Sequence, residues 1–197
     1  MSRQVIIISG PTGSGESTIT NLIVKKYHNF IRLVTATTRQ PRLKEKNGVD
    51  YYFLSKDKFL SEVDKGDIVA YTYIKNRDSY YGTYRPELEE KVSKGYIIIV
   101  NVDGVGVDYY KRKYNAVAIF LKPASLSELR TRLKKRDPSI SETELEKRIE
   151  NATNEIKNEE KYYDYVIFNE NGKLKEAVAE VVRVLKGEGY EGLDNLA

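Results

Sequence analysis

Residues able to wrap a phosphate group lie near the start of the chain. Positions 10–18 fit the phosphate-binding loop pattern G-x-x-x-x-G-K-[ST] except at the lysine. Glycines in such a loop let backbone N–H groups approach phosphate oxygens, and the following helix adds its partial positive charge. The hydroxyl of Ser17 stands where a magnesium ligand is expected. The predicted donor-phosphate loop comprises Gly10, Pro11, Thr12, Gly13, Ser14, Gly15, Glu16, Ser17 and Thr18.

Glu16 replaces the lysine of this pattern. The lysine would bring a positive charge to the β- and γ-phosphates of a nucleoside triphosphate, whereas a glutamate brings a negative one. At ~4 Å and an effective dielectric constant of ~20, one pair of unit charges is worth about 4 kcal/mol. A loss of ~4 kcal/mol corresponds to about a thousandfold in rate or affinity. We therefore expect impaired use of the triphosphate, whether the replacement is native or introduced.

The pattern around the loop predicts an α/β fold with a parallel sheet covered on both faces. The β-branched run 5–9 predicts a buried strand, and 17–26 has helical spacing. We interpret 80–83 as a turn and expect the tail from Gly187 to be frayed. Further strands are expected at 31–35, 68–74, 96–103, 116–121 and 165–168, and further helices at 56–65, 86–94 and 174–185.

The segment 125–163 is helical in pattern and rich in arginine and lysine. One interpretation is a solvated helical hairpin stabilised by pairs four residues apart, such as Glu144 with Arg148. The other is a lid whose arginines close over phosphate groups. The phosphate loop in the same chain favours the lid.

Composition narrows the class of protein. The chain has 197 residues, 40% hydrophobic and 31% charged, which suits one compact core. It has no cysteine and only one histidine, His28, so thiol catalysis, zinc–thiolate sites and histidine-based metal sites are not expected. The net charge of +4 suits an anionic ligand but does not indicate nucleic acid. No apolar run predicts a membrane span or a signal peptide, so we expect a cytoplasmic protein.

Over residues 4–186 the chain resembles the guanylate kinases. The resemblance is carried by T-T-R-x-x-R-x-x-E-x-x-G-x-D-Y-x-F at 37–53, by Y-Y-G-T at 80–83, and by Y-D-Y-V-I at 163–167. It implies a P-loop NTPase three-layer core with a parallel sheet, a small GMP-binding lobe and a helical lid. It also implies ATP-dependent phosphorylation of GMP or dGMP, with Mg²⁺ accompanying ATP. The implied division is core at 1–34, GMP-binding lobe at 35–84, core at 85–124, lid at 125–160, and core with tail at 161–197.

The resemblance also implies roles for single residues. Arginines and tyrosines would hold the GMP phosphate, and Thr35, Thr83 and Asp103 would contact guanine. Glu45 would orient an arginine. The implied GMP-binding set is Thr35, Arg39, Arg42, Glu45, Tyr51, Tyr81, Thr83 and Asp103, and the implied catalytic set is Arg39, Arg132, Arg136 and Arg148, with Glu16 in the lysine position.

Departures from the family pattern keep two alternatives open. Ala70 stands where a guanine-reading glutamate is usual, and Asn101 replaces one of two aspartates. One alternative is therefore a nucleotide kinase with a different acceptor base. The other is a catalytically inactive module that binds GMP or a phosphorylated protein segment. A monomer and a homodimer are both compatible with the sequence.

Overall fold

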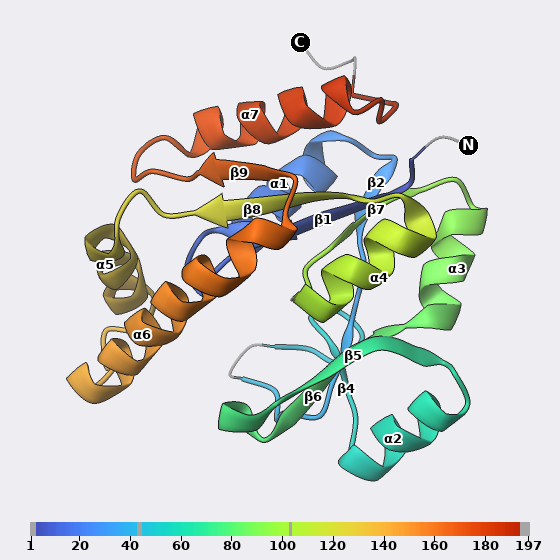
Figure 1. Cartoon of the computed structure of the whole chain (residues 1–197), viewed down its shortest axis with the longest axis horizontal. Helices are drawn as coiled ribbons and strands as arrows, with labels where there is room; N and C mark the ends of the chain where they lie inside the picture. The colour runs from blue at the N-terminus through green and yellow to red at the C-terminus, as the bar shows by residue number, and fades with distance from the viewer. Residues whose placement is uncertain (1–2, 43–44, 103, 194–197) are drawn as a thin grey trace.

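A five-stranded parallel sheet forms the centre of the computed structural model, which describes residues 3–42, 45–102 and 104–193. The strand order is β2-β7-β1-β8-β9, so β1 lies in the middle of the sheet. Every neighbouring pair in it is parallel, as expected when helices connect the strands. A second, four-stranded sheet with the order β4-β3-β6-β5 lies below it in Figure 1.

The elements alternate along the chain as an α/β fold requires. The strands are β1 (Val5–Ser9), β2 (Phe30–Arg32), β3 (Ala36–Thr37), β4 (Tyr52–Phe53), β5 (Ile68–Ile74), β6 (Ser79–Tyr84), β7 (Ile97–Val100), β8 (Val117–Lys122) and β9 (Tyr165–Phe168). The α-helices are α1 (Glu16–Lys26), α2 (Lys56–Asp64), α3 (Arg85–Ser93), α4 (Gly104–Tyr114), α5 (Leu126–Arg136), α6 (Glu142–Glu159) and α7 (Leu174–Gly187). Two short 3₁₀ helices are η1 (Lys75–Arg77) and η2 (Glu160–Tyr162).

Helices cover both faces of the central sheet, giving three layers (Figure 1). Ile6 and Ile8 of β1 pack with α1 and α7 on one face, while Val5 and Ile7 face α3 and α4 on the other. This division follows from the alternation of side chains along a strand. All five residues of β1 are buried, which explains its nearly continuous apolar sequence.

Two predicted core strands are shorter than the sequence suggested. The strand expected at 31–35 is β2, Phe30–Arg32, and the strand expected at 96–103 is β7, Ile97–Val100. In both cases the chain then runs on to the carboxyl edge of the sheet, where Thr35 and Asn101 line a cleft. Because parallel strands all end at this edge, the phosphate loop after β1 and Asn101 after β7 come together there.

The interpretation of 80–83 as a turn is wrong, because these residues belong to β6, Ser79–Tyr84. The strand pairs antiparallel with both β3 and β5, and its aromatic residues suit such a position. Gly82 is needed for packing: a Cβ there would lie 2.7 Å from Ile68 and 3.0 Å from Phe59. Gly82 therefore lets the second sheet close over its small apolar core.

Helices α5 and α6 form a hairpin with a separate apolar cluster around Leu129, Leu133 and Leu145. Both helices begin with a serine cap, since Ser125 and Ser141 accept hydrogen bonds from backbone N–H groups. Arg130 bridges the two helices through ion pairs to Glu142 and Glu146. The hairpin is thus a unit of its own beside the central sheet.

The prediction of a frayed tail from Gly187 is wrong as far as Leu193, where the described residues end. Tyr190 and Leu193 are buried against the core. The Tyr190 hydroxyl donates to the carbonyl oxygen of Val5 at 2.6 Å. The tail is rich in glycine and polar residues, so its composition did not predict this contact. Among the described residues, none of the helices combines the length and apolar composition that a membrane span requires.

Candidate functional site

The candidate site is a cleft of about 480 Å³ at the carboxyl edge of the central sheet. Its wall is formed by the phosphate loop, by the lobe that contains the second sheet, and by α6. The site residues predicted from sequence that line it are Gly10, Thr12, Glu16, Thr35, Arg39, Arg42, Tyr51 and Tyr81. The structure therefore brings the predicted donor and acceptor sides into one cavity.

The phosphate loop has the geometry of an anion site. Gly15 has a left-handed backbone conformation, with φ +99°, and leads directly into α1. Its lack of a side chain is required, because a Cβ would lie 2.3 Å from the amide nitrogen Nδ2 of Asn169. No side chain caps the first turn of α1, so its N–H groups are available to an anion.

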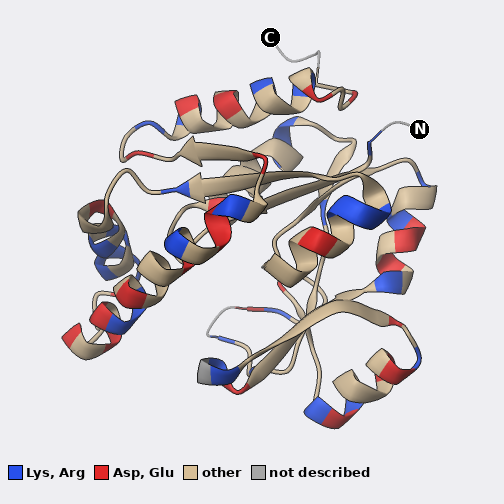
Figure 2. Ribbon diagram, in the orientation of Figure 1, with Lys and Arg blue, Asp and Glu red and all other residues tan. Residues whose placement is uncertain are grey.

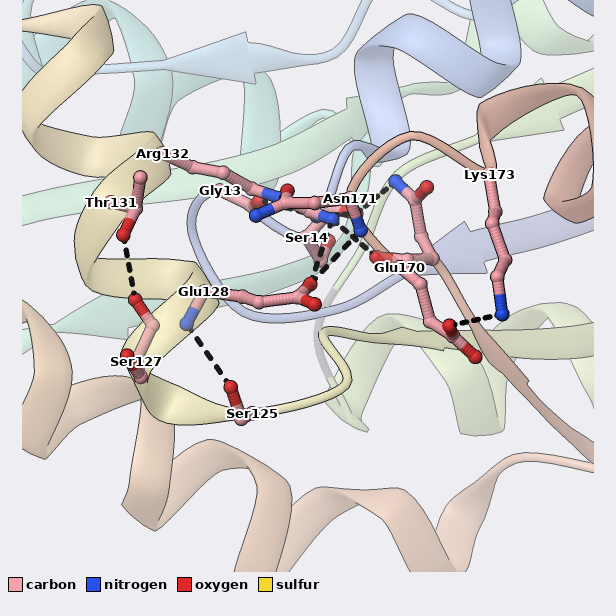
Figure 3. A network of polar contacts seen from close by, with 11 residues as sticks. Gly13, Ser14, Ser125, Ser127, Glu128, Thr131, Arg132, Glu170, Asn171 and Lys173 are labelled. Carbon is pink, nitrogen blue, oxygen red and sulfur yellow. Dashed lines mark hydrogen bonds and ion pairs between the residues drawn. The ribbon is translucent and has the colours of Figure 1, made fainter.

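Arg132 supports this loop through its backbone and does not itself line the cleft (Figure 3). Its Nη1 donates to the carbonyl oxygens of Gly13 and Ser14, both at 3.4 Å, and its Nη2 donates to the carbonyl oxygen of Asn169. Its Nε donates to Oδ1 of Asn171 at 2.7 Å. The structure thus places Arg132 on the loop backbone, whereas the family resemblance implied a catalytic position.

Glu16 is the first residue of α1, and its carboxyl group faces the cleft. The pKa of this carboxyl is raised to about 8, mainly by burial and in addition by the nearby carboxylate of Glu155. Arg32, Arg136 and Arg77 lower it, but by less. The group is therefore mostly neutral at pH 7, so the cleft carries less negative charge than the sequence suggests.

On the acceptor side, Arg39 and Glu45 form a two-bond ion pair. Nη1 and Nη2 of Arg39 donate to the Glu45 carboxylate at 2.6 and 2.8 Å. These hydrogen bonds are the main reason that the pKa of Glu45 is lowered to about 2. The Arg39 guanidinium also lies 5.0 Å from the ring centre of Tyr51, a cation–π distance. Glu45 thus fixes the plane and position of Arg39.

Two tyrosines stand beside this pair. The rings of Tyr51 and Tyr81 are 6.2 Å apart in an edge-to-face arrangement, and both line the cleft. The Tyr81 hydroxyl is buried and has no hydrogen-bond partner within the described part of the chain. A buried hydroxyl of this kind is costly unless it meets a partner, so it suits a bound oxyanion.

Basic residues gather in the last turn of α5, where Figure 2 shows blue ribbon, although neither Arg136 nor Arg148 lines the cleft. Burial lowers the pKa of Arg136, and the like charges of Arg148 and Arg42 lower it further. Arg148 is held by Glu144 at 2.8 Å. Such a concentration of guanidinium groups is favourable only when an anion offsets it, which indicates a phosphate site.

Two other predicted residues do not line the cleft, and a third is not described. Thr83 is fully buried, and its hydroxyl lies 2.7 Å from that of Tyr110, outside the cleft lining. Ser17 is exposed on the first turn of α1 and does not line the cleft. Asp103 lies outside the described residues.

One wall of the cleft was not predicted to have a role. Helix α6 presents an amide and carboxylate face there, made by Asn151, Asn154, Glu155, Asn158 and Glu159. These positions recur at spacings of three and four, so a polar helical stripe was detectable. Thr72, Arg77 and Asn101 also line the cleft without having been predicted to do so.

Comparison with known proteins identifies the family to which this fold and cleft belong. The family model described as guanylate kinase matches residues 2–188. The chain belongs to the guanylate kinase family. The guanylate kinase of Thermotoga maritima is 33% identical over 189 residues, covering 95% of this chain and 88% of its relative. That of Porphyromonas gingivalis is 40% identical over 156 residues, covering 78% and 82%.

Solved structures agree on the fold. The crystal structure of guanylate kinase from Anaplasma phagocytophilum superposes with a TM-score of 0.73 at 28% identity, covering 98% of this chain and 90% of that one. A shikimate kinase from Bacteroides thetaiotaomicron has a TM-score of 0.50 at 16% identity, covering 94% and 99%, which shows similarity of fold alone. The three-layer core is thus that of a P-loop nucleoside-monophosphate kinase of the guanylate kinase family.

Proposed function

We propose that this chain is an ATP-dependent guanylate kinase whose activity is lowered by Glu16. The observation that carries the proposal is the shared cleft: residues of the phosphate loop and Arg39, which Glu45 holds in place, line the same cavity. Transfer of a phosphoryl group needs two nucleotides in line, with positive charge between them and water excluded. We assign residues 35–84 to the acceptor lobe, residues 125–160 to the lid and the remainder to the core.

The acceptor phosphate is held, in this proposal, by Arg39, Arg42, Tyr51 and Tyr81. A guanidinium offers two parallel donors to phosphate oxygens, and the tyrosine hydroxyls add neutral donors. Thr35 lies in the cleft and serves the base, with Asp103 as the proposed acceptor of the guanine N–H edge. Arg136 and Arg148 supply charge to the transferring group from the hairpin side.

The donor triphosphate is held by backbone N–H groups of the loop and the first turn of α1. Among the described residues no three acidic, histidine or cysteine side chains form a metal cluster. This fits a magnesium ion that arrives with the nucleotide and takes one protein ligand, since magnesium commonly binds phosphates, water and one or two protein oxygens. Ser17 would hold it, and when bound the ion offsets phosphate charge.

Glu16 impairs binding of the donor phosphates mainly because the positive charge of a lysine is missing there. At pH 7 its carboxyl is mostly protonated, so repulsion of the phosphates is limited. Protonation does not restore the cation that a lysine would supply. The loss is therefore that of one charge–phosphate attraction, about 4 kcal/mol by the same estimate as above.

The direct test measures ATP-dependent formation of GDP by the unaltered chain and by Glu16→Lys. We expect Glu16→Lys to raise kcat/KM for ATP by roughly a hundredfold or more. Glu176→Lys, on the exposed first turn of α7, makes the same charge change outside the cleft and should change little. Ordinary kinase turnover by the unaltered chain, with no gain in Glu16→Lys, would refute the impairment.

Glu16 also favours a second candidate, a binding module that retains GMP and has lost ATP. Separate calorimetric titrations with GMP and with ATP plus magnesium distinguish the two. Measurable GMP binding with no turnover in Glu16→Lys would support the module. Turnover in Glu16→Lys would support the kinase.

The acceptor base is tested separately, because Ala70 lines the cleft without a carboxylate. We propose GMP as the favoured acceptor, with dGMP as a second substrate. Initial rates with GMP, dGMP, AMP, CMP and UMP should be highest for the guanine nucleotides. If the rate is higher with a nucleotide that carries another base, that nucleotide and not GMP is the favoured acceptor.

A further inference from the structure

Arg77 is a cleft residue that the proposed function has not used. It is the last residue of η1, at the end of the hairpin formed by β5 and β6 (Figure 1). Although η1 belongs to the acceptor lobe, Arg77 lines the same cleft as Glu16 of the phosphate loop. Figure 2 shows basic residues at this end of the hairpin.

The charge of Arg77 reaches the place where the loop pattern has lysine. Together with Arg32 and Arg136, it acts electrostatically on the Glu16 carboxyl. Of the three, Arg32 is already engaged, because its Nη2 donates to the carbonyl oxygen of Asp50 at 2.8 Å. The Arg77 guanidinium makes no hydrogen bond or ion pair within the described chain, so its donors are available to a ligand.

The backbone that carries Arg77 is fixed on the lobe. Asp78, which follows it with φ +46°, accepts two hydrogen bonds of 2.8 Å from Lys56 and one of 2.5 Å from the Tyr73 hydroxyl. The Ser79 hydroxyl donates to the carbonyl oxygen of Arg77 at 2.8 Å. The contacts of Asp78 are exposed and weak alone, but with the part-buried bond from Ser79 they hold the turn, so that the side chain of Arg77 starts from a defined position.

We propose that Arg77 binds the polyphosphate chain of the donor nucleotide and supplies, from the acceptor lobe, positive charge that the phosphate loop lacks at Glu16. This rests on the proposed function, since it assumes a donor triphosphate in the cleft. An arginine suits the role because its planar fork binds two phosphate oxygens at once and stays charged at every physiological pH.

A double-mutant cycle between Arg77 and Glu16 tests the proposal. In the unaltered chain, Arg77→Ala should lower kcat/KM for ATP by roughly thirtyfold, whereas in the Glu16→Lys background the loss should be about threefold or less. The KM for GMP should change by less than about twofold in both backgrounds. Lys75→Ala, in the same turn but outside the cleft lining, is the matched control and should have no effect.

Binding of inorganic tripolyphosphate, measured by calorimetry, gives a readout that needs neither base nor turnover. Arg77→Ala should weaken it in the unaltered chain, and Arg77→Lys should recover part of the affinity. Equal losses in the two Glu16 backgrounds, or unchanged tripolyphosphate binding, would overturn the role of Arg77. If GMP is not phosphorylated even by Glu16→Lys, yet tripolyphosphate binding depends on Arg77, the proposed function fails and this inference stands.

Discussion

The carboxyl groups of Glu16 and Glu155 face the same cleft, one from the first residue of α1 and the other from α6. Their mutual repulsion adds to burial in favouring a proton on Glu16. Two like charges in one confined site rarely ionise together. The phosphate loop thus carries a neutral acid near pH 7, where the family pattern carries a cation.

This relationship predicts how stability depends on pH. The pKa of Glu16 rises from 4.5 to about 8 on folding, so the folded state holds the proton more tightly. Folding is therefore opposed progressively as pH rises above about 4.5, and the full penalty is present above about 8. Glu16→Gln removes the titration. Its free energy of unfolding should be close to that of the unaltered chain near pH 5 and exceed it by roughly 4 kcal/mol at pH 9.

Urea denaturation of the ligand-free protein in chelator, from pH 5 to pH 9, measures this difference. Glu155→Gln should flatten the dependence in part, because it removes the second cause of the raised pKa. Glu176→Gln, which is exposed on α7, serves as control. A constant difference between Glu16→Gln and the unaltered chain across this range would contradict the prediction.

The core of the fold could be predicted because its signals are local. The apolar β-branched run of β1 and the glycines of the following loop specify strand, turn and helix start without distant information. The error at β6 has a non-local cause. Residues 80–83 contain a glycine and look like a turn, but their pairing with β3 and β5 decides their conformation. Tyr190 was missed for the same reason, since its partner Val5 is at the other end of the chain.

Residue types in the site were easier to predict than their orientation. The family resemblance implied that Glu45 orients an arginine, and the structure gives Arg39, in the same short segment, as its partner. Arg132 shows the limit: the family resemblance implied a catalytic role for it, but its hydrogen bonds to the carbonyl oxygens of Gly13 and Ser14 were not predicted. Only the packed structure reveals such contacts between distant segments.

Glu45 should determine how well Arg39 binds phosphate. Without its two hydrogen bonds, the Arg39 guanidinium loses its fixed plane and keeps only its contacts with aromatic rings. We expect Glu45→Ala to raise the Kd for GMP roughly tenfold, a loss of about 1.4 kcal/mol, as measured by calorimetry. Glu62→Ala removes an acid from α2 of the same lobe, outside the cleft lining, and should leave GMP binding unchanged. Equal effects of the two variants would show that Glu45 acts only through lobe stability.

Arg132 and Arg136 should separate structural from ligand-binding roles on one helix. Arg132→Ala removes donors from the backbone of the loop and from Asn171, so it should cost roughly 1–3 kcal/mol of unfolding free energy. Arg136→Ala relieves repulsion from Arg148 and Arg42, so it should leave stability unchanged or slightly raised while weakening tripolyphosphate binding. Thermal unfolding and calorimetry measure the two effects. A loss of stability confined to Arg136→Ala would reverse the assignment.

Gly15 should be intolerant of any side chain for two separable reasons. Its φ of +99° disfavours an L-residue, a cost of roughly 1–2 kcal/mol, and an added Cβ would lie 2.3 Å from Asn169 Nδ2. Asn169 is buried and donates to the carbonyl oxygen of Ser14 at 2.7 Å, so it cannot move without losing that bond. Gly95→Ala is the matched control, because φ there is +80° with no atom within 4 Å of the added Cβ. Gly15→Ala should therefore lose roughly 1–3 kcal/mol more stability than Gly95→Ala.

Shortening the neighbour isolates the steric part of this cost. In the Gly15→Ala background, Asn169→Ser makes room for the new methyl group, so it should restore part of the unfolding free energy. The same Asn169→Ser change in the unaltered chain should destabilise, because it removes the hydrogen bond to Ser14. If positions 15 and 169 are in contact, the change in the free energy of unfolding caused by Asn169→Ser, measured by urea denaturation, should have opposite signs in the two backgrounds. Equal losses would show that backbone strain alone fixes the glycine.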